Sequence, residues 1–324
     1  MKHVCALIGK YFGIIAIIFL ILGLTTPTSF SWVMGKFLGV PVLSLFLGII
    51  MFGMGTTLNL SDFALILKQP KNIFFGILAQ YFVMPFLAFV LSHAFQLEPA
   101  LAVGVVLVGT CPGGMSSNVI TFMSKGDVAF SVTMTSISTL ISPIMTPLLT
   151  YLILGQSIAF DPVGMFISIV QIVIIPIILG LAVKKFLPAL AATANDYLPA
   201  VSSIAISLLI AGIIGASRNA ILNSSAIILL VVILHNVLGY ALGFAIGKLT
   251  GMSWKQMVAV SIEVGMQNSG LATGLAKVHF ASMPLAGVPG TVFSAWHNIS
   301  GAVLAYVSSN YLNKRFDSHY GEDV

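Results

Sequence analysis

Apolar runs long enough to cross a membrane recur along nearly the whole chain, and this feature limits the possible folds most. Ten runs of about 20 residues can be distinguished by length and hydrophobicity. They cover residues 10–28, 38–58, 72–95, 99–124, 127–154, 163–186, 198–216, 221–249, 253–280 and 287–312. Because lipid offers the backbone no hydrogen-bond partners, such runs must be helical. The sequence therefore predicts an all-α polytopic membrane protein with ten transmembrane helices, folded as a single membrane domain over residues 1–324.

Composition excludes a soluble fold. Of the 324 residues, 58% are hydrophobic and 7% are charged, whereas a soluble domain carries about 25% charged residues. No polar stretch is long enough to fold separately in water. The predicted surroundings are therefore a lipid bilayer, and no cofactor or obligate protein partner is indicated.

The basic residues test the number of spans independently, because Lys and Arg gather in cytoplasmic loops. With the N-terminus inside, only Lys36, Arg218 and Lys277 of the 14 basic residues fall outside. The other eleven fall inside: Lys2, Lys10, Lys68, Lys71, Lys125, Lys184, Lys185, Lys248, Lys255, Lys314 and Arg315. We therefore expect a multi-pass protein of the cell membrane with both termini cytoplasmic. The net charge of +5 then reflects topology and gives no support to a nucleic-acid partner.

Two of the apolar runs are interrupted by polar, glycine-rich stretches at residues 109–118 and 263–270. These runs are the fourth and the ninth, so each is the fourth member of a half with five runs. An odd repeat inserts its second copy upside down, and paired breaks in inverted repeats indicate a transporter site. The sequence predicts two inverted five-helix repeats with broken helices 4 and 9. We expect the runs with polar side chains, within 72–154 and 221–312, to form a core bundle. The runs with few polar side chains, within 10–58 and 163–216, should form a second bundle.

Glu263 is the only carboxylate well inside a predicted span, where a charge costs at least ~2.5–3.5 kcal/mol. A bound cation would offset that cost. The neighbouring oxygens, including the amides of Gln267 and Asn268, favour a hard ion such as sodium over zinc, which prefers His and Cys. The alternative is a Glu263 side chain that is protonated, or paired with His235 or His297.

The first break ends at Ser116, Ser117 and Asn118, where a half-helix would point free N–H groups and a positive dipole toward an anion. This predicts an anionic solute. Alternatively, Pro112, Gly113 and Gly114 only kink a packed helix.

Four hydroxyl residues in the fifth run recur at intervals of four, three and four, which places them on one helical face. Ser138 and Ser142 are interpreted as packing residues, whereas Ser131 and Thr135 are equally compatible with packing and with an ion site. Gln80 in the third run is likewise equally compatible with packing and with an ion site. Trp296, His297 and Asn298 form a polar cluster. The interpretation we favour is that they make buried hydrogen bonds, and the alternative is that they contact the solute directly.

Five stretches resemble the bile acid:sodium symporter family in its bacterial branch. They are IMFGMGTTL (50–58), VGTCPGGMSSNV (108–119), GDVAFSVTMTSISTL (126–140), EVGMQNSGLA (263–272) and FSAWHNISG (293–301). The resemblance spans nearly the whole chain. It implies a core domain of segments 3–5 and 8–10, a panel domain of segments 1, 2, 6 and 7, crossing broken helices, and two sodium ions.

The resemblance also implies site residues. The first sodium site would consist of Ser117, Asn118, Ser131, Thr135 and Glu263. The second would consist of Gln80, Glu263 and Gln267 with the carbonyls of Val264 and Met266. The solute would lie where the broken helices cross, and its candidate contacts are Pro112, Gly113, Gly114, Met115, Ser116, Asn268, His297 and Asn298. Met115 stands where close bacterial relatives commonly have Thr, which leaves the identity of the solute open.

Together these features predict a sodium-coupled secondary active symporter of an organic anion, either a bile acid or a small carboxylate such as pantoate. Transport would proceed by alternating access, with two Na⁺ per solute and Na⁺ as the coupling ion. The alternative is a proton-coupled carrier or channel that uses Glu263 as its proton site. An enzyme is not expected, since the chain has neither G-x-S-x-G nor H-E-x-x-H.

Overall fold

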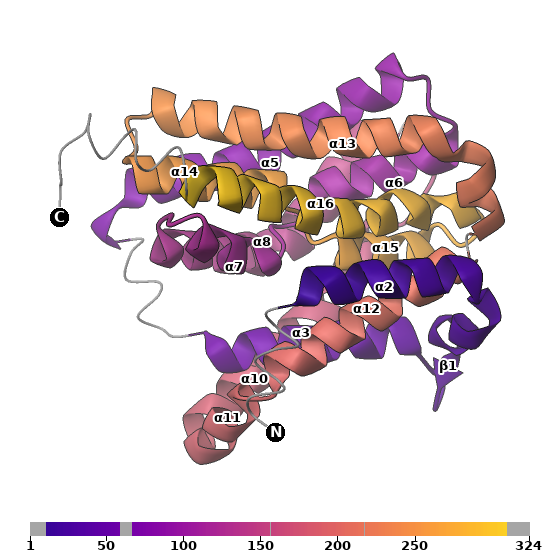
Figure 1. Ribbon diagram of the computed structural model, residues 1–324, viewed down its shortest axis with the longest axis horizontal. Coiled ribbons are helices and arrows are strands. Elements are labelled where there is room, and N and C mark those ends of the chain that lie inside the picture. The colour runs from indigo at the N-terminus through magenta and orange to yellow at the C-terminus, as the bar shows by residue number, and fades with distance from the viewer. Residues whose placement is uncertain (1–10, 59–66, 156, 217, 310–324) are drawn as a thin grey trace.

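A computed structural model describes residues 11–58, 67–155, 157–216 and 218–309. The described part is almost entirely helical, and its helices form two packed groups (Figure 1). Lys2, Lys10, Lys314 and Arg315, which the topology prediction places inside, lie outside the described residues.

The first group contains the helices drawn in the lower half of Figure 1, where α2 and α3 pack on α12, and α3 packs on α10. Its elements are α2 (Phe12–Thr25), η1 (Pro27–Met34), α3 (Val42–Thr57), α9 (Pro162–Ile169), η3 (Val170–Ile174), α10 (Ile175–Phe186), α11 (Pro188–Asn195) and α12 (Leu198–Ala216). Glycine allows the closest approach within this group. A Cβ atom on Gly55 would come within 2.2 Å of the Ile177 carbonyl oxygen, so α3 and α10 meet backbone to backbone.

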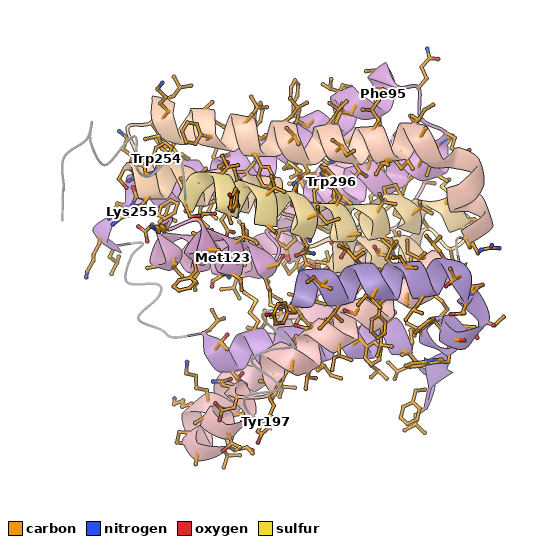
Figure 2. The ribbon with its side chains drawn as sticks, in the orientation of Figure 1. Phe95, Met123, Tyr197, Trp254, Lys255 and Trp296 are labelled. Atoms are coloured by element: carbon orange, nitrogen blue, oxygen red, sulfur yellow. The ribbon has the colours of Figure 1, made fainter. Side chains whose placement is uncertain are left out.

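The second group consists of the helices that surround the two sequence breaks. It comprises α5 (Pro70–Ala94), α6 (Pro99–Thr110), α7 (Ser116–Met123), α8 (Val128–Leu154), α13 (Arg218–Leu249), α14 (Trp254–Gly265), α15 (Ser269–His279), η4 (Pro284–Gly287) and α16 (Val288–Val307). Side chains at its two ends are labelled in Figure 2: Trp254 and Lys255 lie toward one end, and Phe95 lies toward the other.

Four continuous helices in the described residues are long and apolar enough to cross a membrane: Pro70–Ala94, Val128–Leu154, Pro162–Phe186 and Ala226–Leu249. Two bent pairs raise this number to six if each pair counts as one span. These features fit a polytopic membrane protein. Every predicted run contains at least one helix, but several are too short or too bent to count as continuous spans, and the ten-span topology stays a prediction.

The first two predicted runs differ most from the structure. The chain turns by 105° between the end of α2 and η1, because Pro27 has no N–H group to continue the helix. The residues that follow form a short antiparallel hairpin, β1 (Lys36–Phe37) with β2 (Val40–Pro41). Leu38 and Gly39 have positive φ angles of 49° and 83°, as the tight turn of a hairpin requires. Helix α3 therefore begins at Val42, four residues after the predicted start.

Candidate functional site

The two breaks in the sequence meet in the structure. Helix α6 ends at Thr110 and α7 begins at Ser116, while α14 ends at Gly265 and α15 begins at Ser269. The extended residues between them pair antiparallel at Gly113 and Gln267. The Gly114 N–H donates to the Met266 carbonyl, and the Asn268 N–H donates to the Pro112 carbonyl, both at 2.8 Å. Each break thus satisfies backbone groups that the other has freed.

Both unwound stretches are shorter than the polar stretches in the sequence. The second break covers only Met266, Gln267 and Asn268, so Glu263 lies in the last turn of α14. The Asn268 side chain begins the following half-helix by accepting a hydrogen bond from the Leu271 N–H, which is an N-cap interaction. Glu263 is therefore held by a rigid helix end and not by a loop.

Three hydroxyl groups surround the carboxylate of Glu263. The Oγ atoms of Ser117 and Ser131 both lie 2.5 Å from Oε1, and the Thr135 Oγ1 atom lies 2.6 Å from Oε2. The Oδ1 atom of Asn118 lies 2.9 Å from the Ser131 Oγ. The structure thus brings together all five residues proposed for the first sodium site.

This cluster contains more oxygens than protons. The six side-chain oxygens of these five residues carry three hydroxyl protons, those of Ser117, Ser131 and Thr135, and the Thr121 hydroxyl lies 3.2 Å from the Ser131 Oγ. The Ser117 Oγ also lies 2.6 Å from the carbonyl oxygen of Gly114. Glu263 is buried, and no Lys or Arg within the described residues pairs with it. The arrangement is therefore rich in lone pairs, and an ionised Glu263 would carry a charge that no basic side chain of the described residues compensates.

The residues proposed for the second sodium site lie beside the crossing. Gln80 Nε2 donates to Gln267 Oε1 at 2.8 Å, and Gln267 Nε2 donates to the Val264 carbonyl at 2.7 Å. The Oε1 atom of Gln80 is buried and has no hydrogen-bond partner among the described residues. No hydrogen bond joins the Glu263 carboxylate to either glutamine in the described structure, where its hydrogen-bond partners are Ser117, Ser131 and Thr135.

The pairing of Glu263 with a histidine, considered from the sequence, is absent from the described structure. His235 Nε2 instead lies 3.0 Å from the Met84 carbonyl. The more distant hydroxyls of the stripe on α8 bond within their own helix: Ser138 donates to the Thr135 carbonyl, and Ser142 donates to the Thr139 carbonyl. These bonds agree with the packing interpretation of Ser138 and Ser142.

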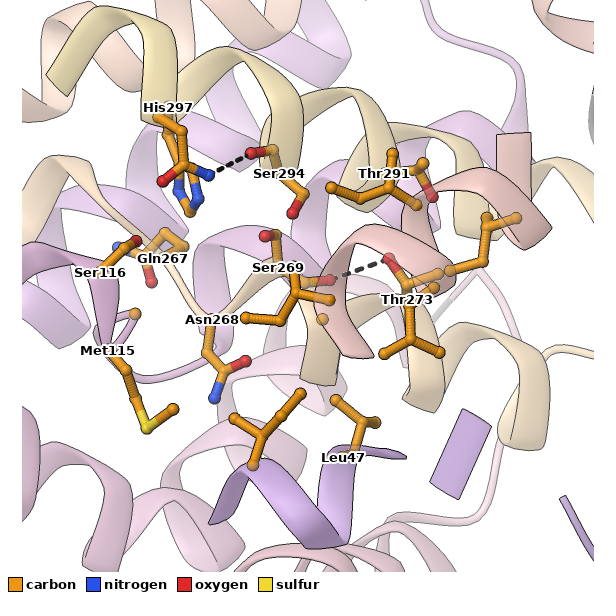
Figure 3. Close-up of a pocket in the computed structure, with 18 of the residues that line it drawn as sticks. Leu47, Met115, Ser116, Gln267, Asn268, Ser269, Thr273, Thr291, Ser294 and His297 are labelled. Carbon is orange, nitrogen blue, oxygen red and sulfur yellow. Dashed lines mark hydrogen bonds between the residues drawn. The ribbon is translucent and has the colours of Figure 1, made fainter. Parts of the chain in front are cut away.

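A pocket adjoins the crossing and lies between the two helix groups (Figure 3). Its lining includes Gly114, Met115, Ser116, Asn268, His297 and Asn298, which are six of the eight proposed solute contacts. Pro112 and Gly113 do not line the pocket. Gly113 pairs with Gln267, and the Pro112 carbonyl accepts from the Asn268 N–H. The pocket therefore includes the end of the first break, at Gly114 and Met115, but not Pro112 or Gly113.

The two walls of the pocket differ in chemistry. One wall carries hydroxyl groups from α15 and α16, namely Ser269, Thr273, Thr291 and Ser294. The opposite wall is apolar and comes from α3 and α12: Leu47, Ile50, Met51, Ile206, Leu209, Ile210 and Ile213. The sequence analysis identified none of these residues. Thr291, Ser294 and Asn298 recur at helical spacing in an apolar run, which could have indicated the polar wall, but the apolar wall has no comparable signature.

The polar cluster on α16 takes part in both packing and the pocket. Asn298 Nδ2 donates to the Ser294 carbonyl at 2.7 Å, as Figure 3 shows. The Nδ1 atom of His297 and the Nε1 atom of Trp296 are buried without hydrogen-bond partners in the described structure. His297 and Asn298 also line the pocket, so support and solute contact are compatible for these two residues.

Comparison with known proteins places the chain among transporters. Residues 44–224 match the model of the sodium bile acid symporter family. The chain is 44% identical over 307 residues to the uncharacterized sodium-dependent transporter YocS of Bacillus subtilis strain 168, covering 95% of this chain and 93% of that protein. It is 38% identical over 285 residues to the probable chloroplastic sodium/metabolite cotransporter BASS1 of Arabidopsis thaliana, covering 88% of this chain and 70% of that protein. It is also 34% identical over 304 residues to the probable chloroplastic sodium/metabolite cotransporter BASS2 of Oryza sativa subsp. japonica, covering 94% of this chain and 71% of that protein.

Proposed function

The chain belongs to the sodium bile acid symporter family, and from that premise we propose that it carries an organic anion into the cell together with two sodium ions. Its family and relatives are sodium-dependent transporters, not enzymes. The ion sites, the solute contacts and the stoichiometry form the proposal.

The oxygen cluster around Glu263 carries this proposal. Six side-chain oxygens with three protons leave lone pairs directed at one another, and a small hard cation relieves that repulsion. A hydroxyl oxygen can ligate an ion through a lone pair while its proton still donates to the carboxylate. Sodium bound by Ser117, Asn118, Ser131, Thr135 and Glu263 would also neutralise the buried charge.

The second ion would bind after a small rearrangement of amides. Gln80 Oε1 is an acceptor without a partner, and the carbonyls of Val264 and Met266 lie at the unwound end of α14. Rotation of the Gln267 side chain away from Gln80 would free a further oxygen. Glu263 would then be shared between both ions, and their occupancy would be coupled.

The solute site adjoins the ion sites. Helices α7 and α15 both begin at the crossing, with Ser116 and Ser269 at their first positions. Their positive dipole ends favour a carboxylate, while the hydroxyls of α15 and α16 and the amide of Asn268 offer hydrogen bonds. The apolar wall of α3 and α12 would cover the hydrocarbon part of the solute. This combination suits a bile acid or a small carboxylate such as pantoate.

Alternating access follows from the two helix groups. In the proposed architecture the second group is a core domain and the first is a panel domain, arranged as ten spans in two inverted repeats with both termini cytoplasmic. Sodium would fix the crossing so that the half-helix ends hold the anion. Movement of the core against the panel would then open the pocket to one side of the membrane and afterwards to the other.

Uptake into proteoliposomes tests the function. Two sodium ions with one monoanion move one net charge, to which 100 mV contributes ~2.3 kcal/mol. Radiolabelled taurocholate and pantoate are the probes. Uptake should require an inward sodium gradient and should rise when the interior is made negative. Uptake of either probe driven by a proton gradient without sodium would overturn the proposal, and sodium-driven uptake without any effect of potential would overturn the stoichiometry.

A further inference from the structure

A second hollow lies at the end of the molecule that carries the β1–β2 hairpin (Figure 1). It is formed by the hairpin, the start of α3, the end of α15 and η4. Six of its lining residues define what we call the outer vestibule: Met34, Lys36, Ser44, Lys277, Met283 and Leu285. The predicted topology puts this end outside the cell.

The outer vestibule is positively charged. Lys36 and Lys277 line it, and no acidic side chain does. Neither ammonium group pairs with a carboxylate in the part of the chain that the structure describes. Only three basic residues are predicted outside, and the third, Arg218, is bound elsewhere, since its Nε donates to the Leu24 carbonyl. Lys277 Nζ contacts the Sδ atom of Met34, which also lines the hollow. The other two predicted outer cations, Lys36 and Lys277, therefore both lie in this hollow.

A thin apolar barrier separates the outer vestibule from the solute pocket. Leu43 lines the vestibule and Leu47, one helical turn further along α3, lines the pocket. Both contact α15 at a glycine: a Cβ atom on Gly274 would come within 2.9 Å of Leu47 Cδ1 and 3.1 Å of Leu43 Cδ2. On α15 itself, Thr273 lines the pocket and Lys277, one turn later, lines the vestibule. The two hollows thus follow one another along the same helix pair.

We propose that the outer vestibule is a docking site for the carboxylate of the transported anion before it enters the solute pocket, with Lys277 as the main cation and Lys36 as the second. The side of entry and the sign of the charge rest on the proposed function. A hollow lined by one sign of charge raises the local concentration of the opposite ion and its association rate. Leu43 and Leu47 would then be the residues that the anion passes when α3 and α15 separate.

Lys277 also lies in the last turn of α15, where a cation is stabilised by the helix dipole. That role is purely structural and does not involve Lys36 or the hollow. The test therefore has to measure the field inside the outer vestibule as well as the stability of the protein.

Thiol labelling measures this field without a known solute. Ser44 lines the hollow and can be changed to Cys with little change in size, in a Cys5→Ser background that keeps the buried Cys111. Anionic and cationic methanethiosulfonate reagents are applied outside sealed cells. The anionic reagent should react faster, and Lys277→Gln should lower the anionic-to-cationic rate ratio by roughly three- to tenfold. Lys277→Arg should keep the ratio, as should the control Lys248→Gln, which removes a charge at the predicted inner face.

An unchanged ratio in Lys277→Gln would overturn the proposal, even if the variant is less stable, because only a structural role would then remain. Reaction of the thiol introduced at Ser44 only with reagent supplied from inside the cell would also overturn the proposal. The ratio difference should vanish in ~1 M salt, where the Debye length is about 3 Å. This readout is independent of sodium stabilisation and of uptake, so failure of the proposed function and failure of the vestibule give different results.

Where taurocholate or pantoate is transported, Lys277→Gln should raise its half-saturating concentration roughly three- to tenfold at low salt. The maximal rate and the stabilisation by sodium should be unchanged. A lower maximal rate with an unchanged half-saturating concentration would contradict docking in the outer vestibule.

Discussion

The backbone N–H of Asn268 donates to the carbonyl of Pro112 at 2.8 Å, although nearly half of the chain separates the two residues. The same Asn268 caps α15 through its side chain and lines the solute pocket. One residue thus joins the two breaks, begins a half-helix and lines the pocket proposed for the solute. Any change in the crossing is expected to affect ion binding and solute binding together.

The spacing at the crossing predicts the effect of Gly114→Ala. A Cβ atom there would lie 2.7 Å from the Gln267 carbonyl oxygen, and such overpacking costs about 1–3 kcal/mol. Melting of the detergent-purified variant should show lower stability and a smaller increase with sodium. Gly48→Ala is the control, because its Cβ would meet only Pro176 Cγ at 3.8 Å. Equal stabilisation of wild type and Gly114→Ala by sodium would show that the crossing does not shape the ion sites.

The hydroxyls on α8 should divide into two classes. Ser131→Ala removes an oxygen 2.5 Å from the Glu263 carboxylate and should weaken sodium binding about tenfold, which corresponds to ~1.4 kcal/mol. Ser142→Ala is the matched control, since its hydroxyl bonds within its own helix. Sodium titrations of thermal stability measure both. Similar affinities in the two variants would assign Ser131 to packing.

Gln80 tests the second ion site separately. Its unpaired Oε1 is the oxygen that the second sodium would gain, so Gln80→Leu should remove one ion and leave the first. The Hill coefficient of sodium-dependent uptake should fall from about 2 to about 1. A coefficient that stays near the wild-type value in a folded Gln80→Leu protein would exclude Gln80 as a ligand.

Asn268→Asp separates solute recognition from helix capping. Aspartate keeps an acceptor for the Leu271 N–H but places a negative charge in the pocket. Stability without solute should change by less than ~1 kcal/mol, whereas stabilisation or uptake of taurocholate and pantoate should be lost. Asn268→Ser, which also keeps a cap, should retain part of the binding. Full activity of Asn268→Asp would place the carboxylate of the solute elsewhere.

The sequence predicted helical class and membrane environment well, because both follow from long apolar runs. The two breaks were also predictable, since Pro112 and the neighbouring glycines interrupt such runs. The hydroxyl cluster required the resemblance, because Ser131 and Thr135 in isolation are equally compatible with packing and with an ion site. The 105° turn before η1 and the hairpin at Lys36–Pro41 were missed, since the first predicted run was continued through Pro27 to residue 28 and the second was begun at Leu38. The individual residues of the apolar wall were not predicted, because Leu47 and Ile210 resemble any lipid-facing or packing residue.

The central claim is that Glu263 holds sodium. The most direct measurement is the melting temperature of the purified protein with sodium or with potassium at the same ionic strength, for wild type and Glu263→Gln. A ligand at 100 times its dissociation constant stabilises the folded state by ~2.7 kcal/mol. We predict a rise in wild type that is specific to sodium and absent in Glu263→Gln. No difference between sodium and potassium in wild type, or an undiminished sodium effect in Glu263→Gln, would contradict the account.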